Sequence, residues 1–139
     1  MSFGARMQKY LKLLDFRKTR YAWLFLAMLA NVAWVISFLR ILEKSYLTSS
    51  GWASGSDVAM LLGVFLGGVF IAFIITLLAK DGRGPTYGIY GGLAGLVTVV
   101  ILVFSSPLLA GLVGLTSLLG GFNGGTLAEG LRFSRQNKK

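Results

Sequence analysis

Long apolar runs alternate with short segments that carry the charges. Residues 21–39 and 58–79 contain no charged side chain, and no acid or base occurs between 84 and 128. A helix needs about 20 apolar residues to cross a bilayer. The first two runs therefore each predict one membrane-spanning helix, and the third is long enough for two.

The third run is divided by the sequence Ser105-Ser106-Pro107. Serine is a good N-cap and proline is favoured at the first helical position, so a new helix is expected to begin at Pro107. A single helix kinked at Pro107 is the alternative, but it would be too long for any bilayer. The continuous runs lack the alternation of membrane β-strands. We therefore predict an all-α, four-helix membrane bundle with spans at about 21–42, 57–79, 86–104 and 107–127.

Basic residues are distributed unequally about these four spans. With the N-terminus inside, twelve lie on the cytosolic side and only two, Arg40 and Lys44, on the other. Basic loops favour the cytosolic side, and a three-span chain would divide the charges almost evenly. The sequence thus predicts cytosolic N- and C-termini, with a basic arm at 1–20, one membrane domain at 21–128 and a basic tail at 129–139.

The N-terminal arm has the pattern of a short amphipathic helix. Apolar residues from Phe3 to Leu14 fall in one arc of a helical wheel, with Lys9 and Lys12 opposite and Arg6 at the flank. Such a helix lies in the membrane interface, with its cations toward anionic headgroups. The arm is expected to anchor the first span, and docking on a partner protein is the alternative.

A second candidate for headgroup contact is the turn at 80–85, with the sequence Lys-Asp-Gly-Arg-Gly-Pro. Lys80 and Arg83 could bind a lipid phosphate or an acidic partner, or could serve only to set the topology of the chain in the membrane. The segment is not a phosphate-binding loop, because Tyr87 stands where the GxGxxG pattern needs its third glycine.

Glycine rows in the spans predict close helix packing. Glycines four residues apart share a helix face and let two backbones approach, which drives association in lipid. The alternative is that a glycine face receives a helix from another protein or from a second copy of the chain. The candidate positions are Gly63, Gly67, Gly88, Gly91, Gly92 and Gly95.

Few polar side chains lie inside the predicted spans. Asn31 is expected to hydrogen-bond across a helix interface, whereas the hydroxyls of Thr76, Thr98, Thr116 and Ser117 can bond back to their own helix. Four glycines around Asn123 make a poor helix. We expect a helix end near Asn123 and Gly124, or else a hinge.

The residues needed for most enzyme chemistry are missing. The chain has no cysteine and no histidine, and its five acidic residues lie at or beyond the ends of the predicted spans. This composition argues against an enzyme, a metal site, a cofactor and an ion-coupled transporter. Its formal net charge of +9 comes from basic residues that flank spans, which argues against nucleic-acid binding.

Two functions fit this pattern. The first is a non-catalytic accessory, assembly or stabilising subunit of a larger membrane enzyme or transporter. The alternative is a small, self-assembling, uncoupled channel or lipid-handling protein with glycine-lined helices. The expected partners are anionic lipid headgroups and a larger integral membrane protein, or a second copy of the chain.

The four spans, glycine rows and basic ends resemble, in pattern, the mitochondrial translocase family. The Arg-x3-Asp signature of that family is absent, because Tyr87 stands four residues after Arg83. No family is assigned on this basis. Among organelles, the endoplasmic reticulum or the plasma membrane is favoured over the mitochondrial inner membrane.

Overall fold

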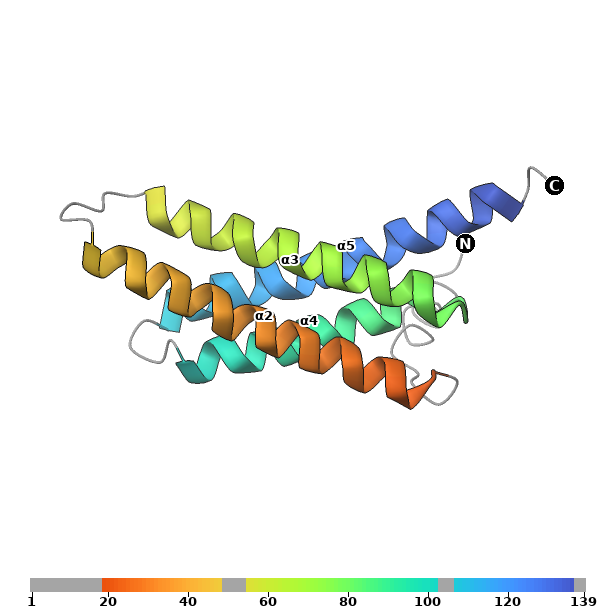
Figure 1. Cartoon of the computed structure of the whole chain (residues 1–139), viewed down its shortest axis with the longest axis horizontal. Helices are drawn as coiled ribbons and strands as arrows, with labels where there is room; N and C mark the ends of the chain where they lie inside the picture. Colours follow the sequence, from red (N-terminus) through yellow and green to blue (C-terminus); the bar gives the residue numbers. More distant parts are fainter. Residues whose placement is uncertain (1–18, 49–54, 103–106, 137–139) are drawn as a thin grey trace, which may run out of the picture.

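The computed structural model describes residues 19–48, 55–102 and 107–136, and they form four helices (Figure 1). No strand occurs within these ranges, so the all-α prediction is confirmed for them. The helices are α2 (Tyr21–Thr48), α3 (Gly55–Ala79), α4 (Gly84–Leu102) and α5 (Pro107–Gln136).

Three of the four helices are long and apolar enough to cross a membrane. Their apolar segments are Tyr21–Ile41, Val58–Ala79 and Gly84–Leu102. Helix α5 is not among the candidate spans found within the described residues. Length and composition therefore give three candidate spans where the sequence predicted four.

Helix α5 lies against both α3 and α4, and these two interfaces are the most extensive in the structure. Helix α2 packs on α4 and, less extensively, on α3. The start of α2, the α3–α4 turn and the C-terminal end of α5 lie at the same end of the bundle (Figure 1). This arrangement brings together charged residues that are far apart in the sequence.

The interior consists mainly of small aliphatic side chains. One buried cluster is built around Val35, Val64, Val99 and Val113, and a second joins Tyr87 to alanines and Ile75 near the α3–α4 turn. Large apolar side chains are mostly on the outside, as expected for helices whose surroundings are lipid. The helices are therefore in close contact along their axes.

The α3–α4 turn is tight. Lys80 has a positive φ of 53° and Gly82 one of 75°, while the amide of Lys80 still donates to the carbonyl of Thr76 at 3.3 Å. A residue in the left-handed region commonly ends a helix in this way, and it is usually glycine. The amide of Arg83 donates to Asp81 Oδ1 at 3.1 Å and helps to start α4.

Several features differ from the sequence prediction or lie outside the described residues. Helix α5 continues without interruption from Pro107 to Gln136, past the end expected near 127. The amphipathic arm, with Arg6, Lys9 and Lys12, and the turn expected at Ser105–Ser106 lie outside the described residues.

Candidate functional site

Glycines on α4 and α5 bring the two backbones into contact. A Cβ built on Gly88 would overlap the main chain of Gly121, and one on Gly92 would lie 2.5 Å from the Cα of Leu118. One turn away, a Cβ on Gly84 would lie 2.5 Å from the carbonyl oxygen of Gly125. Because backbone atoms cannot move aside, a larger residue at these positions must displace a helix.

The same stretch of α5 also meets α3 through neighbouring glycines. A Cβ on Gly120 would lie 2.5 Å from the carbonyl oxygen of Phe65, and one on Gly124 would overlap the carbonyl of Val69. Adjacent residues point about 100° apart on a helix. The two glycine pairs, 120–121 and 124–125, thus let α5 approach α3 with one residue and α4 with the next.

Gly63 and Gly67 on α3 lie beneath aromatic rings of α2. The rings of Trp34 and Phe38 stack with centroids 5.8 Å apart, and they occupy the space that side chains at the two glycines would need. Trp34 Nε1 donates to the carbonyl of Gly63 at 3.1 Å. In this α2–α3 contact, aromatic rings of α2 pack against the backbone of α3. A ring can rotate away from a larger residue at these glycines, whereas backbone atoms cannot.

Gly91 and Gly95 lie where α4 meets polar side chains of α2 and α5. A Cβ on Gly91 would lie 2.6 Å from Asn31 Nδ2, and one on Gly95 would overlap Ser117 Oγ. Asn31 Nδ2 donates to the carbonyl of Ala27 in its own helix at 3.0 Å. The hydrogen bond expected to run from Asn31 across a helix interface is thus made within α2 instead.

Two buried polar atoms in this region have no hydrogen-bond partner among the described residues, Asn31 Oδ1 and Ser117 Oγ. Both side chains are 1% exposed. The hydroxyls of Thr76, Thr98 and Thr116 do bond back to carbonyls of their own helices, as expected. Ser117 does not follow this expectation.

Asn123 and Gly124 lie inside a continuous helix. Asn123 is exposed and its Nδ2 donates to the carbonyl of Leu119 at 2.8 Å, so the predicted end of the helix is not found here. Gly124 packs on α3, which explains how a glycine-rich segment stays helical. An open groove beside Asn123 is bounded by Thr126, Leu127, Gly130 and Leu131.

Tyr87 links three segments at the charged end of the bundle. Its fully buried hydroxyl accepts a hydrogen bond from the amide of Arg20 at 3.0 Å and donates one to the Asp81 carboxylate. Arg20 precedes α2, and Asp81 belongs to the α3–α4 turn. A lone tyrosine gives no sequence signal for this structural role, and Tyr87 entered the sequence prediction only as the residue that excludes two motifs.

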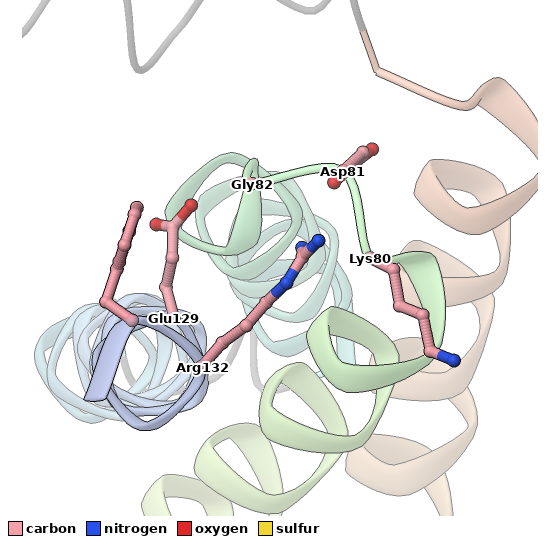
Figure 2. A pocket seen from close by; sticks show the side chains of 6 residues that line it. Lys80, Asp81, Gly82, Glu129 and Arg132 are labelled. Carbon is pink, nitrogen blue, oxygen red and sulfur yellow. The ribbon is translucent and has the colours of Figure 1, made fainter. Parts of the chain in front are cut away.

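A cavity of about 180 Å³ lies between this turn and α5. Figure 2 shows the side chains of Glu129 and Arg132 extending from α5 toward the turn, while the Lys80 side chain extends away from them. Phe133 completes the lining. This site was not predicted from the sequence, in which Glu129 and Arg132 belong to the expected tail, although their i, i+3 spacing places them on one helix face.

Burial raises the pKa of Glu129, and the negative charge of Asp81 raises it further, against the smaller opposing effects of Arg132 and Arg83. Among the described residues, no group of three or more His, Cys, Asp or Glu side chains comes together as a metal site would require. Two acids, Asp81 and Glu129, and two bases, Lys80 and Arg132, line a small space, with Glu129 and Arg132 extending into it from α5.

Comparisons of the chain with models of known protein families, with curated proteins and with solved structures find no match.

Proposed function

We propose that this protein is a non-catalytic, multi-pass membrane subunit that supports the assembly or stability of a larger membrane enzyme or transporter. The observation that carries the proposal is the location of the glycines: the rows on α3, α4 and α5 contact neighbouring helices of the same chain. Such packing favours a rigid body whose lateral surface is left for a partner and for lipid.

The outer surface has the apolar character that such a partner requires. Phe25 on α2 and Phe70 on α3 are 68% and 65% exposed. Of the three candidate spans, the one on α2 is the least buried within the chain. We therefore place the contact with the larger protein on α2 and the adjoining face of α3.

We propose that α5 is a fourth span and that both termini are cytosolic. Leucines along α5 are exposed at about every turn, as a lipid-facing stripe requires, at Leu108, Leu112, Leu115, Leu119 and Leu127. The α3–α4 turn, which holds Lys80 and Arg83, lies at the same end of the bundle as the last turns of α5 (Figure 1), whereas Arg40 belongs to the later half of α2. The N-terminal arm would lie in the cytosolic interface of the endoplasmic reticulum or plasma membrane.

This topology can be measured with single cysteines, because the chain has none of its own. Ser134→Cys should react with an impermeant maleimide only after the cytosolic face is exposed, and Ser50→Cys should react from the opposite side. Labelling of both positions from the same side would contradict a four-span topology.

The decisive experiment is purification from native membranes in mild detergent, followed by mass spectrometry. One larger integral membrane protein should copurify at a fixed ratio. Phe25→Ala and Phe70→Ala should weaken that association without lowering the melting temperature. A chain that purifies alone, self-assembles and conducts ions or transfers lipid after reconstitution would instead be an uncoupled channel or lipid-handling protein.

A further inference from the structure

The cavity at the charged end lies where a phospholipid headgroup would be found. The α3–α4 turn, which lines the cavity, follows directly after the candidate span that ends at Ala79 and precedes the candidate span that starts at Gly84. The ends of apolar spans lie at the level of the polar headgroups. A ligand that enters this cavity from the side would therefore be the head of a lipid.

The cavity is too small for most soluble ligands. Its volume of about 180 Å³ is below the roughly 300–1,000 Å³ typical of small-molecule sites. A headgroup with only a few non-hydrogen atoms fits such a space, while its glycerol and acyl chains can remain outside. Phe133, which is 62% exposed, gives the lining an apolar part.

The charges that point into the cavity are of both signs. Arg132 offers a guanidinium, whose planar donors suit the oxygens of a phosphate. Glu129 offers a carboxylate, and Glu129 Oε1 lies 3.5 Å from the position of a Cβ on Gly82. Among the described residues, no hydrogen bond or ion pair joins Glu129 to Arg132, so each is available to a ligand.

The lining carries two acids, Asp81 and Glu129, beside two bases, Lys80 and Arg132, so a headgroup with charges of both signs complements it better than a purely anionic one. Burial and Asp81 raise the pKa of Glu129, so its carboxylate would gain from a cation that compensates its charge. A primary ammonium supplies that compensation and donates up to three hydrogen bonds. A quaternary ammonium donates none and prefers an aromatic cage, whereas only one aromatic side chain lines this cavity.

We infer that this cavity binds the phosphoethanolamine headgroup of a phospholipid, with Arg132 on the phosphate and Glu129 on the ammonium. The inference does not depend on the proposed accessory role. Lys80 also lines the cavity, but its side chain extends away from those of Glu129 and Arg132 (Figure 2).

The test uses the full chain in nanodiscs of phosphatidylcholine that contain a minor fraction of phosphatidylethanolamine or of phosphatidylglycerol. Native mass spectrometry counts the lipids that stay bound. Phosphatidylethanolamine should be retained about tenfold over either of the other lipids, as one charge-assisted hydrogen bond allows. Equal retention of phosphatidylglycerol and phosphatidylethanolamine would overturn the inference.

Variants separate the two contacts. Glu129→Gln should abolish the preference for phosphatidylethanolamine over phosphatidylcholine, and Arg132→Gln should lower retention of both lipids. Arg40→Gln, toward the opposite end of α2, is the matched control and should change neither. An unchanged preference in Glu129→Gln, with an unchanged melting temperature, would contradict the inference.

Soluble compounds distinguish a lipid from a free metabolite with the same headgroup chemistry. O-Phosphoethanolamine should compete with the lipid only weakly, because it lacks the apolar part, and inorganic phosphate should not compete. Displacement of the lipid by O-phosphoethanolamine at equal concentration would show that the site serves a soluble ligand and would contradict the lipid assignment.

Discussion

Gly88 on α4 and Gly121 on α5 lie with their main chains in contact, and neither position has room for a methyl group. A Cβ at either residue meets backbone of the other helix. The pair therefore fixes the distance between α4 and α5 about one turn after the start of α4.

Gly88→Ala and Gly121→Ala should each lower the free energy of unfolding by about 1–3 kcal/mol, the usual cost of overpacking. Gly111→Ala is the matched control, because a Cβ there meets nothing within 4 Å. It should stabilise the helix by about 0.5–1 kcal/mol. Thermal unfolding in detergent measures all three, and equal tolerance would contradict the backbone contact.

Tyr87→Phe should destabilise the protein by about 1–3 kcal/mol, because it leaves the amide of Arg20 and the carboxylate of Asp81 without this partner. Tyr21→Phe makes the same chemical change at an exposed position and should have little effect. If the two variants unfold at the same temperature, the hydroxyl of Tyr87 does not hold these segments together.

Lys80→Gly should stabilise the α3–α4 turn by about 1 kcal/mol, because glycine adopts a positive φ without the steric penalty of other residues. Lys80→Ala removes the same charge but keeps the penalty, so it should bring no such gain. Comparison of the two melting temperatures isolates the backbone effect from the effect of charge.

Asn31→Leu should be nearly neutral or stabilising, within about 1 kcal/mol, although it removes a buried amide. The Asn31 carbonyl has no partner among the described residues, and an apolar group of similar shape removes that cost. Asn31→Asp, which introduces a carboxylate, should destabilise strongly. A large loss of stability in Asn31→Leu would contradict this account of the Asn31 carbonyl.

The stability of the protein should depend on Glu129 at mildly acidic pH. Its pKa is raised in the folded state, so the carboxyl takes up a proton on folding when the pH lies between its unfolded and folded pKa values. Glu129 therefore favours the folded state at low pH and loses this effect as the pH rises through the folded pKa. Thermal unfolding of Glu129→Gln across this range should lack that component, and an identical pH profile would contradict it.

The charge pattern predicted the apolar segments of α2, α3 and α4 well because a membrane helix must exclude charge, and this requirement is local. It did not predict that α2 continues to Thr48, six residues past the expected end at about 42. The end of α3 at Ala79 follows from Lys80 and the glycines after it. The C-terminal extent of α5 could not be predicted in this way. Its last turns contain polar and charged residues as well as apolar ones, and the glycines before them predicted an end of the helix.

Sequence could also indicate that glycines serve packing, but not which helix each one meets. Gly120 and Gly121 are identical in type and adjacent in the chain, yet they contact α3 and α4 respectively. Which helix each glycine contacts depends on how α3, α4 and α5 pack together. The role of Tyr87 is similar, since its partners are 67 and six residues away.

The two glycine pairs of α5 have a consequence for biogenesis. Among the described helices, α5 is translated last, yet it shares more extensive interfaces with α3 and α4 than they share with each other. Until α5 has left the ribosome, the glycine faces of α3 and α4 have no covering helix from this part of the chain. Completion of the bundle thus waits for α5, and until α5 arrives lipid or another protein has to cover those faces.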